Sequence, residues 1–175
     1  MRKFLIVAVF MLSACAVEAN GPAFQQVTDQ GRTDDLVRTF VFRDKATYLA
    51  QASYIRSPWV VIDGKEIGNL KNGGFVVADL KPGDHVVTIG AGSEEPTSKG
   101  FRTVPGADGY IEVFDKTRVQ TSVIIGGVLG GAIGGAIAGA INDSNQPENE
   151  GRIWRVSFPV PSDAQPRLEK LFLSR

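Results

Sequence analysis

The chain has one cysteine and one histidine among its 175 residues, and this scarcity excludes several kinds of site. Because Cys15 has no second cysteine to pair with, no internal disulfide can form, and a folded domain must be held together by its apolar core. One histidine and one cysteine are too few for a cluster of zinc ligands, and no Gly-x-Ser-x-Gly motif marks a serine nucleophile. We therefore predict a protein that is not an enzyme and that holds no metal or other cofactor.

An excess of charge of either sign is also missing, since 19 basic residues stand against 19 acidic ones. Loss of Arg2 and Lys3 with a signal peptide would still leave the chain close to neutrality. No basic patch interleaved with aromatic residues stands out, and such a patch is the usual mark of a surface that binds nucleic acid. Nucleic acid is therefore not an expected partner.

The N-terminal residues have the layout of a secretory signal. Arg2 and Lys3 precede an unbroken apolar run over residues 4–12, which is too short to span a bilayer permanently. The run closes on Leu12-Ser13-Ala14-Cys15, which resembles the bacterial lipobox, in which the preceding peptide is removed and the cysteine sulfur receives diacylglycerol. We expect a signal peptide over residues 1–14 and lipidation at Cys15.

An acylated Cys15 would hold the mature chain on a membrane. Each buried acyl methylene contributes about 0.8 kcal/mol, so several acyl chains on one residue form an anchor that hardly dissociates. Ala16, in place of Asp, resembles the signals that direct lipoproteins to the outer membrane, which in a proteobacterial host predicts the periplasmic face of that membrane. The alternative is ordinary signal cleavage near Ala19, which would discard the cysteine.

The rest of the chain reads as one β domain with an insertion. Residues 15–35, rich in Gln, Asn, Gly and Thr, predict a flexible tether. Short runs of β-branched and aromatic residues then predict a β domain over residues 36–120, and a last strand and C-terminal helix over 152–175 complete it. The expected strands cover residues 36–42, 59–62, 66–70, 75–80, 85–90, 100–104, 110–114 and 152–158.

The expected C-terminal helix begins after Pro159 and Pro161, which end the last strand. Ser162 or Asp163 could cap it, and its apolar residues fall on one face that can pack against the domain. These apolar residues are Leu168, Leu171 and Phe172.

Two turn sequences organise the expected strands. Asp63-Gly64 predicts a tight hairpin because glycine accepts a positive φ, and Lys81-Pro82-Gly83-Asp84 predicts another chain reversal, so successive strands should be antiparallel neighbours. His85 begins a strand, where its ring can contact loop carbonyls. We interpret five residues as turn and structural residues, with a ligand site as the alternative. They are Asp63, Gly64, Pro82, Gly83 and His85.

Three segments together show a family resemblance. They are Thr39-Phe40-Val41-Phe42-Arg43, then Val60-Val61-Ile62-Asp63-Gly64-Lys65-Glu66-Ile67-Gly68-Asn69-Leu70-Lys71-Asn72-Gly73, and Leu80-Lys81-Pro82-Gly83-Asp84-His85. The set resembles a family of small bacterial lipoproteins that carries the domain of unknown function 2846, related to PEGA-type modules. This resemblance implies a small antiparallel β-sandwich of the prealbumin type without catalytic activity. An extended loop over residues 44–57 and the glycine-rich block described next depart from the usual pattern.

Residues 123–141 contain no charge and carry glycines at a spacing of four. On a helix these small residues would form one broad face, the chemistry of close helix packing known as a glycine zipper. Glycine costs about 1 kcal/mol against alanine in a helix interior, so such a helix needs lipid or a packed partner. We expect a Gly-rich apolar helix over residues 121–141, followed by a polar linker over 142–151. The glycines of its face are Gly126, Gly127, Gly130, Gly131, Gly134, Gly135 and Gly139.

The length of this block restricts its topology. Nineteen residues at about 1.5 Å each span roughly 28 Å, which suffices for one crossing of a hydrocarbon core but not for two. One crossing would place the last strand on the wrong side of the membrane, away from the sheet that it should join. We therefore expect a membrane-inserted or membrane-surface segment that self-associates, with a helix packed against the β domain of one monomer as the alternative.

The sequence thus predicts a non-enzymatic, lipid-anchored envelope protein that contacts the membrane or forms a homo-oligomer through its glycine-rich segment. Two alternatives stay open. The first is a binding module in which Tyr48, Tyr54 or Trp59 contacts an envelope glycan or protein. The second is an oligomer that permeabilises membranes through its glycine face.

Overall fold

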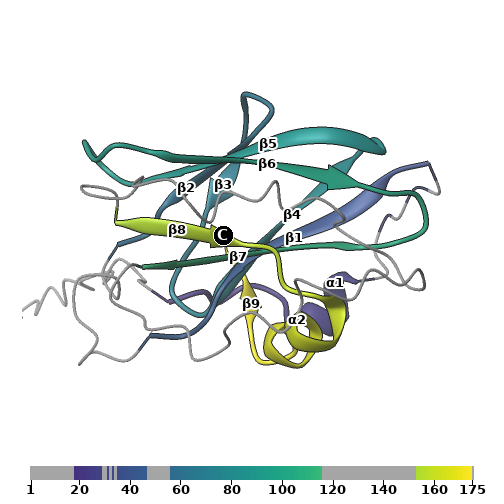
Figure 1. Ribbon diagram of the computed structural model, residues 1–175. Coiled ribbons are helices and arrows are strands. Elements are labelled where there is room, and N and C mark those ends of the chain that lie inside the picture. The colour runs from purple at the N-terminus through teal and green to yellow at the C-terminus, as the bar shows by residue number, and fades with distance from the viewer. Residues whose placement is uncertain are drawn as a thin grey trace, which may run out of the picture.

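The computed structural model describes residues 18–28, 31, 33, 35–46, 56–115 and 153–174. Over these residues the fold is mainly β, with two sheets and two short helices (Figure 1). The elements are α1 (Phe24–Val27), β1 (Val37–Arg43), β2 (Trp59–Ile62), β3 (Lys65–Asn69), β4 (Gly74–Leu80), β5 (Gly83–Gly90), β6 (Thr97–Thr103), β7 (Gly109–Asp115), β8 (Trp154–Ser157), α2 (Pro161–Leu168) and β9 (Phe172–Leu173).

One sheet has five strands and the other has four. The five-stranded sheet has the order β8-β7-β1-β4-β9, and the four-stranded sheet has the order β3-β2-β5-β6. All neighbours in the four-stranded sheet are antiparallel. In the five-stranded sheet β1 is antiparallel to β4 but parallel to β7, with Thr39 opposite Gly109, and β4 is parallel to β9. The expectation of a wholly antiparallel fold is therefore wrong for this mixed sheet.

The expectation that successive strands pair holds only in part. β2 with β3 and β5 with β6 are consecutive antiparallel neighbours, but β1–β2, β3–β4, β4–β5 and β6–β7 each connect one sheet to the other. The chain alternates between sheets because the apolar face of each sheet must be covered by a second layer. Between β1 and β7 the chain passes through the other sheet and returns. This long connection allows β7 to lie parallel to β1, which a short hairpin cannot do.

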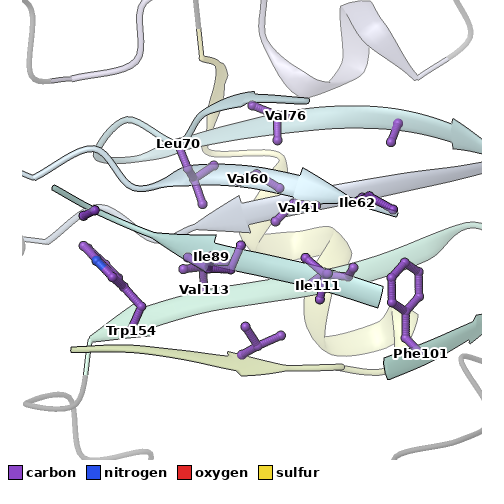
Figure 2. Close-up of a cluster of buried hydrophobic side chains, with 14 residues drawn as sticks. Val41, Val60, Ile62, Leu70, Val76, Ile89, Phe101, Ile111, Val113 and Trp154 are labelled. Carbon is purple, nitrogen blue, oxygen red and sulfur yellow. The ribbon is translucent and has the colours of Figure 1, made fainter. Parts of the chain in front are cut away.

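The main core lies between the two sheets (Figure 2). Val41 and Ile111 of the five-stranded sheet face this core, as do Val60 and Ile89 of the four-stranded sheet. The full set of buried residues is Val41, Val60, Ile62, Leu70, Val76, Ala78, Val87, Ile89, Ala91, Phe101, Ile111, Val113, Trp154 and Val156. In β2 and β8 buried residues alternate with less buried ones, because successive side chains point to opposite faces of a sheet.

A second, aromatic core covers the other face of the five-stranded sheet. Phe40 and Phe75 of this face form edge-to-face contacts with Phe24 of α1. The remaining members of this cluster are Phe42, Tyr110, Ala164, Leu168 and Leu171, so α2 packs on the same face. Each residue of β1 is buried because the strand is covered by the other sheet on one side and by the helices on the other. The described residues thus form three layers, as Figure 1 shows.

The predicted last strand is confirmed as a member of the β domain. β8 pairs with β7, with Asp115 opposite Trp154. Leu168 and Leu171 are buried against the five-stranded sheet, as the sequence predicts. Phe172, by contrast, lies beyond the helix in β9 and is 45% exposed, so its predicted place on the buried helical face is wrong. α2 ends at Leu168, so Leu171 also lies beyond the helix, although its side chain is buried.

The prediction of a flexible tether over residues 15–35 is wrong for much of the part that the structure describes. The backbone of Glu18 forms an isolated β-bridge with Asn72, and that of Ala23 forms one with Phe172. Phe24 is only 7% exposed. A single phenylalanine among polar residues gives little periodic signal, but burying its ring contributes about 2 kcal/mol or more, enough to hold this segment on the sheet.

Several predictions fall on residues outside the described part of the chain. These are the signal peptide, lipidation at Cys15, the glycine-rich segment 121–141, the linker 142–151, and the side chains of Tyr48 and Tyr54. Among the described residues, no helix is both long enough and apolar enough to cross a membrane.

Candidate functional site

The connections between strands gather at two opposite ends of the sheets. At one end, which we call the Asn72 pole, lie the paired strand ends Arg43 with Gly74 and Asp115 with Trp154. The opposite end, which we call the His85 pole, contains the Asp63-Gly64 hairpin turn and the connection from β4 to β5. The two poles have different chemistry.

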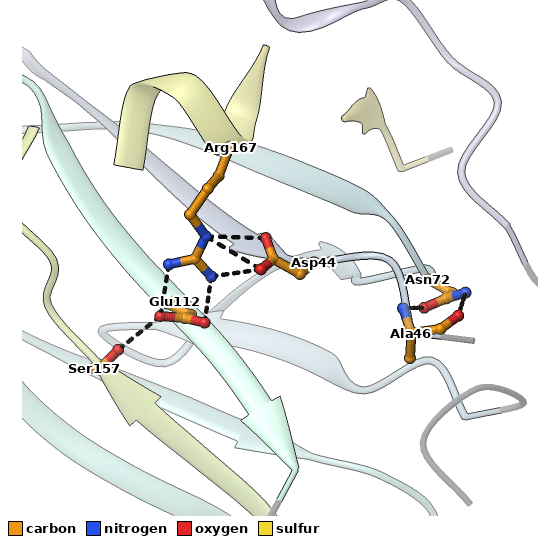
Figure 3. A network of polar contacts seen from close by, with 6 residues as sticks. All are labelled: Asp44, Ala46, Asn72, Glu112, Ser157 and Arg167. Carbon is orange, nitrogen blue, oxygen red and sulfur yellow. Dashed lines mark hydrogen bonds and ion pairs between the residues drawn. The ribbon is translucent and has the colours of Figure 1, made fainter. Parts of the chain in front are cut away.

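Asn72 ties three segments together at the first pole. Its side chain is 1% exposed, and its amide accepts a hydrogen bond from the Ala46 amide nitrogen at 2.8 Å and donates one to the Ala46 carbonyl at 3.0 Å (Figure 3). The Asn72 carbonyl accepts a hydrogen bond from the amide of Ala19 at 3.1 Å. Lys45 also forms an ion pair with Glu18, at 3.0 Å. The N-terminal segment and the chain after β1 are therefore both attached to the turn before β4.

The ends of β7 and β8 form the next part of this pole. Because Asp115 and Trp154 are opposite each other, the chain leaves the sheet and returns to it at one point. The guanidinium of Arg43 lies 4.9 Å from the centre of the Trp154 ring and donates a hydrogen bond to the Arg56 carbonyl. Burial lowers the pKa of Arg43 to about 10, and the charge of Asp115 opposes this effect. A cation–π contact and a nearby carboxylate thus compensate a buried charge.

A partly buried ionic network connects α2 to the five-stranded sheet (Figure 3). Arg167 donates to both carboxylate oxygens of Asp44, at 2.8 to 3.1 Å, and to both oxygens of Glu112. Glu112 also accepts a hydrogen bond from the hydroxyl of Ser157 at 3.2 Å. Burial lowers the pKa of Arg167, but its bonds to Glu112 and Asp44 outweigh this and hold the pKa above the ordinary value. The network is a structural clamp, since each charge has an opposite partner.

The His85 pole carries a hydrogen-bonded chain of side chains. The Nδ1 atom of His85 lies 2.6 Å from the carboxylate of Asp63, and Nε2 lies 2.8 Å from the Lys81 carbonyl and 3.1 Å from the Thr103 hydroxyl. The Thr103 hydroxyl donates to the Lys81 carbonyl at 2.9 Å, and Thr103 is 3% exposed. Although an acid, an imidazole and a hydroxyl meet here, the hydroxyl proton points to a carbonyl and the oxygen is buried. The arrangement holds the turn and offers no exposed nucleophile.

The turn residues at this pole follow the geometry that the sequence predicts. Asp63 and Gly64 have φ values of 50° and 78°, and they join Ile62 to Lys65 in a two-residue hairpin. Positive φ at both positions is typical of a type I′ turn, which favours Asp-Gly. Pro82 and Gly83 connect β4 of one sheet to β5 of the other. All five predicted turn residues therefore lie at one pole.

A shallow hollow lies beside Trp59 on the outer face of the four-stranded sheet. Trp59, Val61, Glu66 and Asn69 line it. Trp59 is opposite both Asn69 and Gly90 in the neighbouring strands. A Cβ atom on Gly90 would lie 2.2 Å from the Trp59 ring, so the indole lies directly over this glycine. The hollow combines an aromatic ring with an amide and a carboxylate, the groups that commonly contact sugars.

Sequence reasoning missed Asn72 and Arg167. Asn72 stands in a turn motif, but nothing in its local sequence indicates that its amide bonds Ala46, 26 residues before it. Arg167 follows a proline in a short helix, and its partner Asp44 is 123 residues away. Among the described residues, no group of three or more histidine, cysteine or acidic side chains could hold a metal ion.

Comparisons with family models, with curated proteins and with solved structures found no match for this chain. The resemblance to small lipoproteins therefore depends on the motifs of the sequence alone.

Proposed function

We propose that this protein is a non-enzymatic, lipid-anchored protein of the bacterial cell envelope, built on a prealbumin-like β-sandwich. The observation that carries the proposal is the sequence Leu12-Ser13-Ala14-Cys15 directly after a short apolar run. Two packed sheets with a shared core support the sandwich. The alanine after the cysteine supports a place on the periplasmic face of an outer membrane.

The glycine-rich segment would provide membrane contact or self-association. Its two flanks, Asp115 and Trp154, are paired residues of one sheet, so the segment starts and ends on the same side of any membrane. A single crossing is incompatible with that pairing, and the block is too short for two crossings. These facts favour a segment that lies at the membrane surface, enters it partially, or packs against a second copy through its glycine face.

Replacing Cys15 tests the lipid anchor. In cells that express the Cys15→Ser variant we expect an unprocessed precursor or a soluble periplasmic protein. The matched control Ser13→Ala keeps the cysteine and a small residue near it, so this variant should stay with the membrane. Mass spectrometry of the wild-type N-terminus should find acyl chains on residue 15. An unmodified sulfur, or a mature chain that begins beyond this residue, would refute the anchor.

Replacing two glycines tests self-association. Crosslinking in cells should trap oligomers of the wild type, and Gly131→Leu with Gly135→Leu should remove most of them because leucine side chains prevent close approach of two backbones. Ile133→Leu, in the same segment, is the control and should leave the crosslinks unchanged. Leakage from liposomes measured with the same variants tests the alternative of a membrane-permeabilising oligomer. Equal crosslinking in all variants would contradict a glycine interface.

The hollow beside Trp59 supports a second candidate function, which is binding of an envelope glycan. The indole of Trp59, which lies over Gly90, can stack on a sugar ring, while Asn69 and Glu66 can form hydrogen bonds with the hydroxyl groups of the sugar. A peptidoglycan pull-down with wild type, Trp59→Ala and Val86→Ala tests it, since Val86 is exposed on the neighbouring β5. Binding should be lost only in Trp59→Ala. Failure of the wild type to bind would remove this candidate.

A further inference from the structure

The proposed lipid anchor and the glycine-rich segment join the described domain at the same pole. Glu18, three residues after Cys15, forms a bridge with Asn72. The chain also leaves β7 after Asp115 and returns directly before Trp154 at this end. We propose that the Asn72 pole rests on the surface of the lipid bilayer, held there by the short connection to Cys15, and that the His85 pole points away from it. This inference rests on the proposed lipid anchor.

The length of chain between the anchor and the domain restricts the orientation. Only Ala16 and Val17 separate Cys15 from Glu18. An extended residue spans at most about 3.5 Å, so the three steps cover roughly 10 Å. An acylated cysteine lies at the lipid interface, and the bridge between Glu18 and Asn72 must then lie close to that interface. A free tether up to β1 would have allowed any orientation.

The attachment of the N-terminal segment to the sheet is secured along its length. The amide of Gly21 donates to the Leu173 carbonyl at 3.1 Å, and the amide of Leu173 donates to the Pro22 carbonyl at 2.8 Å. A Cβ atom on Gly74 would lie 2.7 Å from the Cβ atom of Ala19, so the glycine permits the close approach of the segment. Because the segment packs on the edge of the sheet from Glu18 onward, its first described residue stays at the Asn72 pole.

The same orientation sets which residues lie far from the membrane. β4 has seven residues, from Gly74 at the Asn72 pole to Leu80 at the other pole, and the six steps between them, at about 3.3 Å each, cover roughly 20 Å. With the strands upright on the bilayer, the Asp63-Gly64 turn and His85 would lie about this distance farther from the lipid than the Asn72 pole. Strand connections at the Asn72 pole, including residues 91–96 between β5 and β6, would lie against the lipid headgroups.

Site-specific fluorescent labels can measure this orientation. Acylation blocks the thiol of Cys15, so an introduced cysteine is the only free one in the mature protein. Ser93→Cys labels the loop after β5 at the Asn72 pole, and Lys65→Cys labels the hairpin at the His85 pole; both residues are exposed. In phosphatidylethanolamine and phosphatidylglycerol vesicles that contain a headgroup-attached quencher, the Ser93→Cys label should lose most of its fluorescence. The Lys65→Cys label should keep nearly all of its fluorescence.

A spacer variant tests the role of the short connection. Insertion of a flexible Gly-Ser spacer between Val17 and Glu18 should leave the protein on the vesicles but reduce the quenching of the Ser93→Cys label by more than half. Equal quenching of the two labels overturns the orientation, and an unchanged signal after the insertion overturns the role of the short connection; the lipid anchor stands in both cases. Absence of acyl chains on the protein overturns the anchor and the inference together, and mass spectrometry of the same sample distinguishes these cases.

Discussion

Single side chains hold several of the connections between strands in the described part of this protein. Asn72 bonds the backbone of Ala46, and His85 lies between the carboxylate of Asp63 and the carbonyl of Lys81. Each of these contacts replaces water on a polar group that is partly or wholly removed from solvent. Replacement of one of these residues should therefore lower the free energy of unfolding.

The contact between Asp63 and His85 predicts a loss of stability in acid. Burial raises the pKa of Asp63, but the hydrogen bonds from His85 and from the Val86 amide outweigh it and hold the pKa below the ordinary 3.8. The carboxylate therefore stabilises the fold above the unfolded pKa, and this contribution disappears as the pH falls through the folded pKa. Asparagine also tolerates a positive φ, so Asp63→Asn keeps the turn. The substitution should lower the free energy of unfolding by less than about 1 kcal/mol, because the side chain of Asp63 is half exposed.

Urea denaturation at several pH values measures this effect. The stability difference between wild type and Asp63→Asn should be present at pH 6 and should shrink as the pH falls below the ordinary pKa of 3.8. Asp84→Asn, which removes an exposed ion pair with Arg102, is the control for general charge effects. A difference that stays constant down to acid pH would contradict the assigned role of the carboxylate.

The helix α2 is held to the sheet by a partly buried ionic contact as well as by apolar packing. It has eight residues, includes Pro166, and has no side-chain hydrogen bond at its N-cap. Isolated helices of this length are unstable in water. Leu168 packs on the five-stranded sheet, and Arg167 reaches both Asp44 and Glu112. The sheet and the clamp together hold the helix in place.

Removal of Arg167 should therefore destabilise the protein strongly. Arg167→Met leaves the carboxylate of Glu112 without its ion-pair partner in a buried environment, and loss of one partner of such a pair costs about 3 kcal/mol. The double variant Arg167→Met with Glu112→Gln should recover more than half of this loss, because the buried charge is gone. Urea denaturation of the single and double variants measures both values. A double variant as unstable as Arg167→Met would show that lost packing, not charge, is the cause.

The molecule as a whole has two poles of different character. The Asn72 pole gathers the N-terminal segment and both flanks of residues 116–152, and the His85 pole consists of short turns. The pairing of Asp115 with Trp154 means that the segment between them is an insertion between two neighbouring strands. An insertion of this kind can be removed without breaking the sheet if a short turn can replace it.

Replacement of residues 117–152 by a four-residue Asn/Gly turn should leave the β domain folded. Each halving of a loop lowers its closure cost by about 0.6 kcal/mol, so the shorter protein should melt at the same or a higher temperature. Circular dichroism and a thermal melt measure the result. A melting temperature that falls by more than about 5 °C would instead favour a glycine-rich helix packed against the domain of one monomer.

Local sequence patterns were sufficient to predict most elements of the β domain. The β-branched and aromatic runs predict the seven strands of the main domain and the last strand, because residues of these types favour the pleated and largely buried surface of a sheet. Asp63-Gly64 predicts its hairpin because few other residue pairs accept two positive φ values. These features depend on neighbours in the chain, so they can be read without knowledge of the fold.

Three features could be known only from the tertiary structure. They are the division of the strands between two sheets, the parallel pairs in the mixed sheet, and the docking of residues 18–28. Phe24 is buried only because β1 and β4 place Phe40 and Phe75 beside it. The clamp of Arg167 joins residues 123 positions apart in the chain. Contacts over such separations depend on how layers cover one another's apolar faces, and no local pattern records that arrangement.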